Sequence, residues 1–178
     1  MKKNRDNDDS RNIFISGELD EENTKKVIER MLELQEISIN KPISIIIDSY
    51  GGNVDSMFAI TDVMDILVPD VNTICVGKAM SASAFIFICG TNGKRLMSKT
   101  SRLMLHQMSQ CIHGDVKDLD IYTEEIKYLQ SVMVHEISKR SKLSVSSVED
   151  IIDRERYIRP NEAIKMGLCD GIIRRLQC

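Results

Sequence analysis

The segment Ile43–Asp48 constrains the fold most strongly, because isoleucine stands at four of its six positions. A run that is apolar at nearly every position is typical of a central strand covered on both faces, as in parallel sheets. Further strands are expected at Asn12–Ser16 and Val71–Val76, and helices at about 21–36 and 54–67. Strand and helix therefore alternate, which predicts an α/β fold with a largely parallel sheet and right-handed crossovers.

The second half of the chain adds short elements and one long helix. Short strands are expected at Lys94–Met97, Arg102–His106 and Leu168–Arg174, and short helices at about 145–152 and from Pro160 to Gly167. The long helix, at about 116–141, has an apolar stripe formed by Tyr122, Ile126, Leu129, Met133 and Ile137. The stripe fits packing against another subunit as well as it fits packing across the helix's own domain.

The composition argues against several classes of protein. A chain of 178 residues with 42% hydrophobic content fits one ordinary domain, and a net charge of −3 lacks the basic footprint of nucleic-acid binding. Five cysteines without a CxxC pair are expected to be reduced thiols rather than disulfides or zinc ligands. Residues 1–10 are expected to be a disordered tail without a signal peptide, and no apolar run reaches membrane-spanning length. We therefore expect a cytoplasmic protein.

The segment Gly77–Gly90 contains the best candidate for a nucleophile. It begins with small residues and is apolar throughout from Ala84 to Cys89, which predicts a buried helix with Ser81 at its start. A helix N-terminus carries a partial positive charge and unpaired N–H groups, which stabilise a developing oxyanion. Ser81 is therefore predicted to be the nucleophile of a serine peptidase. Ser83 is a rival, but we expect its side chain to point into packing.

A serine nucleophile needs a general base and an orienting acid. Of the three histidines, His106 ends an expected strand, where sites gather in α/β sheets, whereas His113 lies in a loop and His135 in the long helix. His106 is the favoured base. The segment Asp153–Tyr157 offers two carboxylates among arginines, although a solvated charge run explains it better from the residues alone.

Backbone N–H groups are the expected oxyanion donors. One would come from Gly51-Gly52, since glycine lets a substrate backbone approach closely, and the other from Ala82, next to the nucleophile. A glycine pair after a strand is a weak signal alone, and a plain tight turn is the more common explanation. The chain has no GK[ST] or GxGxxG motif, and the order Ser, His, acid without a GxSxG motif disfavours an α/β-hydrolase.

Several blocks of the sequence together resemble one known family. They are IFISG at 13–17, DSYGGNV at 48–54, PDVNTICVGKAMSASAF at 69–85, GKRLM at 93–97, SRLMLHQ at 101–107 and DRERYIRPNEAIKMGLCDGII at 153–173. In this order and at these spacings they resemble the ClpP family, the proteolytic subunits of the ATP-dependent Clp proteases. The resemblance runs from about Arg11 to the C-terminus, and it implies a single peptidase domain over residues 11–178.

The resemblance implies roles for particular residues. Ser81 matches the nucleophile, His106 the general base, and Glu155 the acid position, where the family typically has aspartate. Gly52 and Ala82 match the oxyanion-hole donors.

The resemblance also implies an architecture and partners. Asp153 and Arg154 match an acid–arginine pair that links two rings, and the helix at about 116–141 matches a protruding handle that interdigitates between them. The implied fold is a crotonase-like superhelix of repeated ββα units, assembled as two stacked heptameric rings. An AAA+ unfoldase would use ATP to deliver unfolded protein, while this chain would bind neither a nucleotide nor a metal.

Three departures from the family pattern bear on activity. Glu155 is one methylene longer than aspartate, and residues 107–114 lack the usual proline and glycines. From the resemblance we also expect most of the segment that forms axial gating loops in the family to be missing, with only the polar residues 1–10 in its place. The matching residues nevertheless lead us to predict a serine endopeptidase acting on unfolded proteins and peptides. The alternative is a weakly active or inactive structural subunit that needs a partner subunit. An acyl-CoA enzyme on the same fold ranks last, because neither paired carboxylates nor a basic patch stands out.

Overall fold

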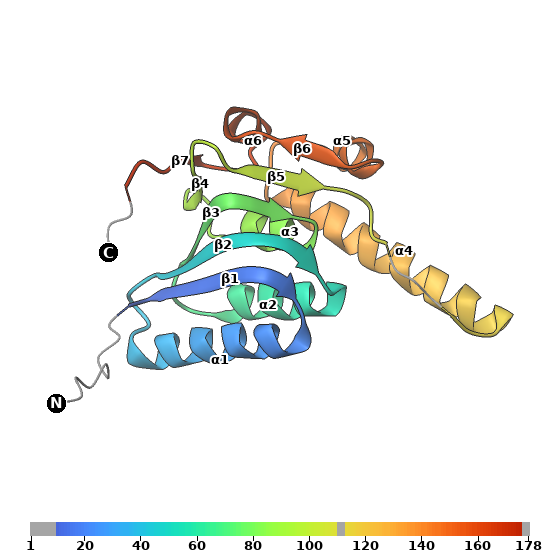
Figure 1. Ribbon diagram of the computed structural model, residues 1–178, viewed down its shortest axis with the longest axis horizontal. Helices are drawn as coiled ribbons and strands as arrows, with labels where there is room; N and C mark the ends of the chain where they lie inside the picture. The colour runs from blue at the N-terminus through green and yellow to red at the C-terminus, as the bar shows by residue number, and fades with distance from the viewer. Residues whose placement is uncertain (1–9, 110–112, 176–178) are drawn as a thin grey trace.

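The computed structural model describes residues 10–109 and 113–175 (Figure 1). Its strands are β1 (Asn12–Leu19), β2 (Ile43–Gly52), β3 (Val71–Met80), β4 (Arg95–Met97), β5 (Arg102–Leu105), β6 (Arg156–Ile158) and β7 (Gly171–Ile172). Its helices are α1 (Glu21–Ile37), α2 (Val54–Ile66), α3 (Ala82–Ile88), α4 (Val116–Lys139), α5 (Val145–Ile152) and α6 (Pro160–Met166). The mixed α/β class is confirmed, whereas the predicted disordered tail lies outside the described residues except for Ser10.

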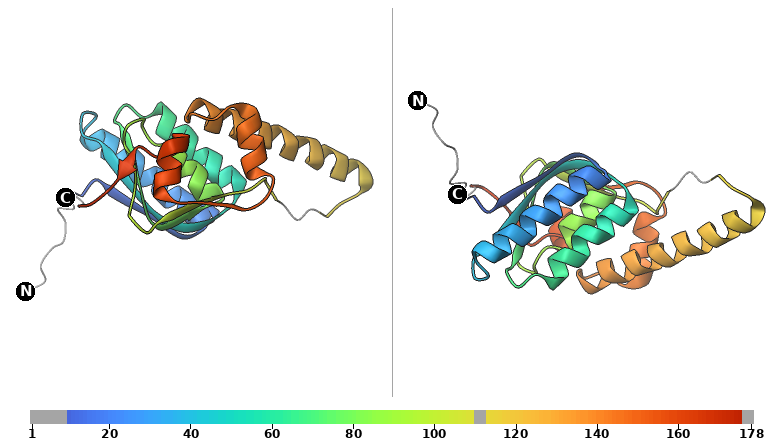
Figure 2. Two further views of the ribbon diagram at one scale, coloured as in Figure 1. Left: turned by 90° about the horizontal axis from the view of Figure 1, so that it is seen from above. Right: turned by 90° about the horizontal axis from the view of Figure 1, so that it is seen from below.

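One sheet forms the centre of the fold. Its strands run in the order β1-β2-β3-β4-β7, and all of these neighbours are parallel. β3 pairs with β4 through Thr73–Cys75 and with β5 through Lys78–Met80, so its two halves have different neighbours. β6 then pairs antiparallel with β5. Helices α1, α2 and α3 lie side by side on one face of the sheet (Figure 2).

The core lies between that sheet face and the three helices. Ile43, Ile45 and Ile47 of β2 are fully buried on the helix side, and Ile46 is buried on the opposite side, as expected for a central strand. All seven residues of α3 are buried. A helix this short is not stable alone, so packing against the rest of the domain must stabilise it. Each large apolar side chain removed from water contributes about 1.5–3 kcal/mol of stabilising free energy.

Helix α4 projects beyond the rest of the molecule (Figure 1). Its second half buries Met133, Val134 and Ile137 against the domain. Its first half leaves the stripe residue Tyr122 50% exposed and its neighbour Ile121 67% exposed. The apolar stripe therefore packs across its own domain over only part of its length, and a role as a handle between rings stays a prediction.

Several elements differ from the sequence-based prediction. β1, β2 and β3 continue through Leu19, Gly52 and Met80, beyond the apolar runs, across irregular registers that the hydrophobic pattern does not reveal. β6 was not predicted, because Arg156 and Tyr157 are exposed and give no strand signal. β7 covers only Gly171–Ile172 of the expected final strand. No helix in the described ranges is long and apolar enough to cross a membrane.

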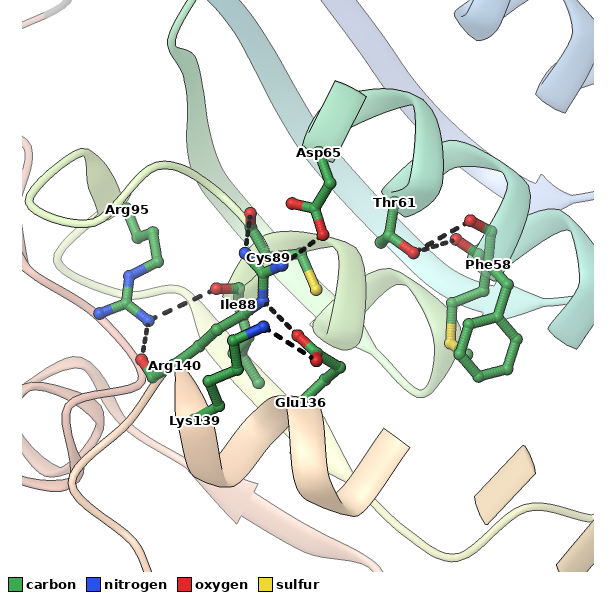
Figure 3. Close-up of polar contacts among 10 residues, drawn as sticks. Phe58, Thr61, Asp65, Ile88, Cys89, Arg95, Glu136, Lys139 and Arg140 are labelled. Carbon is green, nitrogen blue, oxygen red and sulfur yellow. Dashed lines mark hydrogen bonds and ion pairs between the residues drawn. The ribbon is translucent and has the colours of Figure 1, made fainter. Parts of the chain in front are cut away.

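Two arginines hold the C-terminal end of α3. Arg140, at the end of α4, donates to the Cys89 carbonyl (3.1 Å), Asp65 (2.5 Å) and Glu136 (3.1 Å), as Figure 3 shows. The buried Arg95 donates to the Ile88 carbonyl (3.4 Å) and the Arg140 carbonyl (2.7 Å). Positive charge suits a helix C-terminus, where the last carbonyls lack partners within the helix.

Arg95 also forms a largely buried ion pair with Asp170, at 2.7 Å between Nη2 and Oδ1. Burial alone would raise the pKa of Asp170, but the hydrogen bonds and charge of Arg95 outweigh it and hold the pKa below 3.8. Because the folded pKa lies below the unfolded one, the pair stabilises the fold above about pH 4, and this stability is lost as the pH falls through the folded pKa.

We therefore expect Asp170→Asn to lower the urea midpoint at pH 7 and to flatten its decline as the pH falls below about 4. Urea titrations at a series of pH values would measure both effects. Asp65→Asn is the matched control, because Asp65 also pairs with an arginine but has a side chain 52% exposed. An exposed ion pair contributes little to the free energy of unfolding. Parallel pH curves for wild type and Asp170→Asn would contradict the prediction.

Candidate active site

Ser81 lies in a sharp turn between β3 and α3. Its φ of 53° and ψ of −127° make it the sole residue other than glycine with positive φ in the described ranges. The turn is held by hydrogen bonds from Ser81 N to Met104 O (2.8 Å) and from Ala84 N to Ser81 O (2.9 Å). A non-glycine residue in this region is strained, and such strain persists where the surroundings fix it, as at functional sites.

The side chain of Ser81 faces His106. Ser81 is the N-cap residue of α3, yet its hydroxyl caps no N–H group. Oγ instead lies 2.8 Å from Nε2 of His106. β3 and β5 are parallel and pair as far as Met80 and Met104, so the residues that follow them emerge at the same sheet edge. The structure thus brings together the serine and the histidine that the sequence singled out.

The Gly51-Gly52 turn lies directly against Ser81. A Cβ on Gly51 would come 2.6 Å from Met80 O and 2.9 Å from Ser81 Cβ, so this approach requires glycine. Gly51 N already donates to Ser49 Oγ (3.0 Å). Asn53 N donates to Leu19 O on β1 (2.8 Å), which ties the end of the turn to that strand.

The N–H of Ala82 is the other predicted oxyanion donor. It opens α3 immediately after Ser81, among the first N–H groups of the helix, which have no partner within it. Ala82 and Gly52 line the same pocket as Ser81 and His106. Two backbone donors can therefore converge beside the serine hydroxyl.

Glu155 stands one residue before β6. The antiparallel register pairs Leu105 with Arg156, and one further step would place Glu155 opposite His106. Its side chain is exposed and accepts a long hydrogen bond from Tyr157 Oη (3.4 Å). Among the residues that the structure describes, no hydrogen bond joins Glu155 to His106. The backbone thus brings the acid position beside the histidine, but the carboxylate does not contact the ring.

Asp153 and Arg154 lie at the surface. Their side chains are 72% and 89% exposed, and Arg154 Nε lies 3.8 Å from Asp153 Oδ2. The adjoining backbone is anchored near the site, because Gln107 N donates to Ile152 O (2.7 Å) and Gln107 Nε2 donates to Asp153 O (3.2 Å). This pair is therefore accessible to another molecule, while its backbone is joined to the segment that carries His106.

Methionines line the pocket beside Ser81. This pocket of about 80 Å³ is lined by Met108, by Met57 of α2 and by Met133 of α4, and a second hollow of about 150 Å³ adjoins it at Met108. Sequence analysis placed Met133 only on the apolar stripe of its helix, and periodicity could not show that Met133 and Met57 meet beside Ser81. Methionine is flexible, so such a lining suits varied apolar side chains.

A larger cavity lies elsewhere. It measures about 710 Å³ and lies at the C-terminal end of α3, beside Arg95, Arg140 and Asp170. These three charged groups are engaged with one another and with nearby carbonyls. In the described ranges no cluster of three or more histidine, cysteine, aspartate or glutamate side chains could hold a metal ion.

The geometry around Ser81 suits nucleophilic catalysis. A serine hydroxyl within hydrogen-bond reach of an imidazole can lose its proton to the ring as it attacks a carbonyl carbon. Backbone N–H groups beside that hydroxyl can stabilise the negative charge that develops on the carbonyl oxygen. The arrangement is therefore suited to acyl transfer.

Comparison with known proteins gives a consistent result. The family model described as Clp protease matches residues 5–176. The ATP-dependent Clp protease proteolytic subunit 2 of Parasynechococcus marenigrum is 34% identical over 161 residues, which cover 90% of this chain and 82% of that protein. The protein of the same name from Streptomyces coelicolor is 33% identical over 166 residues, which cover 93% of this chain and 76% of that protein.

Proposed function

The chain belongs to the Clp protease family and is a serine peptidase, and we propose that Ser81, His106 and Glu155 form its catalytic triad. The observation that carries this proposal is the 2.8 Å contact between Ser81 Oγ and His106 Nε2 at the strained turn before α3. Ser81 and His106 are also the two residues that the sequence analysis selected as nucleophile and base.

The proposed mechanism follows from the positions of these groups. His106 takes the proton of Ser81 as Oγ attacks the peptide carbonyl, and it returns that proton to the leaving amine. The N–H groups of Gly52 and Ala82 hold the oxyanion of the tetrahedral intermediate. Glu155 orients the imidazole and stabilises its protonated form. Water then hydrolyses the acyl-enzyme by the same steps, so the reaction needs no cofactor.

The proposed substrates are unfolded proteins and short peptides with loose sequence preference. The support is the pocket beside Ser81, whose flexible methionines can accommodate different apolar side chains. We propose that residues 11–178 form a single peptidase domain located in the cytoplasm.

The proposed assembly is two stacked heptameric rings that work with a Clp-type AAA+ unfoldase, which alone uses ATP. Family membership supports oligomers that act with Clp ATPases. Ile121, Tyr122 and Tyr128 on the projecting half of α4 are apolar and exposed, as a helix that packs against another subunit requires. The exposed Asp153–Arg154 pair is available for the contact between rings.

Hydrolysis of a fluorogenic peptide, combined with labelling by a fluorophosphonate, tests the proposal. We expect the purified protein to cleave the peptide, and mass spectrometry to locate the label on Ser81 of an assembled ring. The structural-subunit alternative is disfavoured, because Ser81 and His106 are both present and in contact. An assembled ring that neither cleaves peptides nor takes up the label would restore that alternative.

A further inference from the structure

Ser83 is fully buried in the first turn of α3, two residues after the proposed nucleophile. Its hydroxyl accepts a hydrogen bond from Met80 N at 2.8 Å. The carbonyl oxygens of Met80 and Ser49 lie 2.8 Å and 3.0 Å from the same hydroxyl, which can donate its single proton to either. Sequence analysis expected this side chain to serve packing alone, but it is the centre of a small polar network.

The network joins the two halves of the proposed oxyanion hole. Met80 immediately precedes Ser81 on β3, and Ser49 lies just before the Gly51-Gly52 turn on β2. The regular ladder between these strands is interrupted here, because Ile47 pairs with Cys75 whereas Ser49 pairs with Ala79. At this irregularity the Ser83 hydroxyl supplies a connection between the strands that an uninterrupted ladder would otherwise provide.

A second network supports the same turn from the opposite side. Ser49 Oγ accepts from Gly51 N (3.0 Å) and donates to Gly17 O (2.5 Å) on β1. The strand that carries Gly52 is therefore held on one side by β1 and on the other by Ser83. Neither serine lies in the pocket beside Ser81, so neither is placed to touch the substrate.

We propose that Ser83 is a positioning residue, which sets the distance between the Gly52 N–H and the Ser81 hydroxyl. This inference rests on the proposed function, because it concerns the geometry of that oxyanion hole. Oxyanion donors act on the transition state and contribute little to ground-state binding, so a displaced Gly52 should lower kcat and leave KM unchanged.

The test compares Ser83→Ala with Thr73→Val in the assembled enzyme. Thr73 is also fully buried and donates to α3, but at its last turn, through Oγ1 to Phe87 O at 2.7 Å. We expect Ser83→Ala to lower kcat about ten- to hundredfold with KM unchanged, because a small displacement of a group at the reacting centre lowers the rate strongly. Its affinity for a peptide boronate, whose serine adduct mimics the tetrahedral intermediate, should fall by the same factor. Thr73→Val should change none of these values.

The possible outcomes separate this inference from the proposed function. Equal effects of Ser83→Ala and Thr73→Val on kcat, or a rise in KM alone, would overturn the positioning role while leaving the triad intact. Wild-type protein without peptidase activity would overturn both. If Ser83→Ala does not assemble, Ser83→Cys retains a weak donor and acceptor at the same place, and we expect a smaller fall in kcat at constant KM. Wild-type kcat in Ser83→Cys would contradict the proposal.

Discussion

Replacement of Ser81 by alanine is expected to lower kcat for a fluorogenic peptide by about 10⁴-fold or more, because the acyl-enzyme can no longer form. KM should change little, since the methionine-lined pocket and the backbone donors remain in place. Steady-state kinetics on rings of matched mass would measure both values. Loss of one hydroxyl at a half-buried position should leave the assembly intact, which mass measurement on the same samples would verify.

His106→Ala and the double variant provide the control. Serine and base act as a unit, so each single substitution should lower kcat about as much as the double substitution does. If the losses in the two single variants instead multiplied, Ser81 and His106 would not belong to one catalytic unit. Peptidase activity that survives in Ser81→Ala would place the nucleophile elsewhere in the chain.

The architecture could largely be predicted from hydrophobic patterning. The apolar run at Ile43–Asp48 predicted a central strand, and its isoleucines are buried on both faces of the sheet. Pro160 and Gly167 predicted the bounds of α6, because they suit the first turn and the left-handed cap of a helix. The pattern could not predict β6, whose exposed residues are held by pairing with β5 rather than by burial.

The candidate site could be predicted in part. Ser81 was recognisable because it precedes a buried apolar helix, and His106 because it ends an expected strand; the parallel pairing of β3 with β5 brings the two together. The role of Ser83 was not recognisable, since it depends on an irregular register between β2 and β3 that no periodicity encodes. The methionine lining was missed for a similar reason, because it depends on where two helices meet the end of β5.

Helix α3 connects the stability of the fold to the proposed chemistry. At its N-terminal end the Ser83 hydroxyl binds the turn that carries the nucleophile. At its C-terminal end Arg95 and Arg140 bind the last carbonyls and tie them to α4 (Figure 3). The helix is too short to be stable alone, so these contacts and the surrounding apolar packing fix the position of Ser81.

Glu155→Gln is expected to lower kcat roughly 10²- to 10⁴-fold, because an amide cannot stabilise the protonated imidazole and favours the wrong tautomer. Continued by one step, the register would place residue 155 opposite His106, and directly opposed residues have a Cβ–Cβ distance of about 4.5–5.5 Å. Across so short a span, an aspartate reaches the ring directly, whereas the longer glutamate must fold back and in the structure lies near Tyr157 Oη instead.

Glu155→Asp is therefore expected to match or exceed the wild-type kcat. Glu155→Gln tests the effect of the carboxylate charge on kcat, and Glu155→Asp tests the effect of side-chain length. A loss in Glu155→Gln together with a gain in Glu155→Asp would show that the carboxylate acts on His106 and that its extra methylene limits the rate. Tyr157→Phe removes the competing hydrogen bond and should shift kcat in the same direction as Glu155→Asp, by a smaller factor. Unchanged kcat in Glu155→Gln would exclude Glu155 as the orienting acid, since a carboxylate that holds the catalytic tautomer cannot be exchanged for an amide without cost.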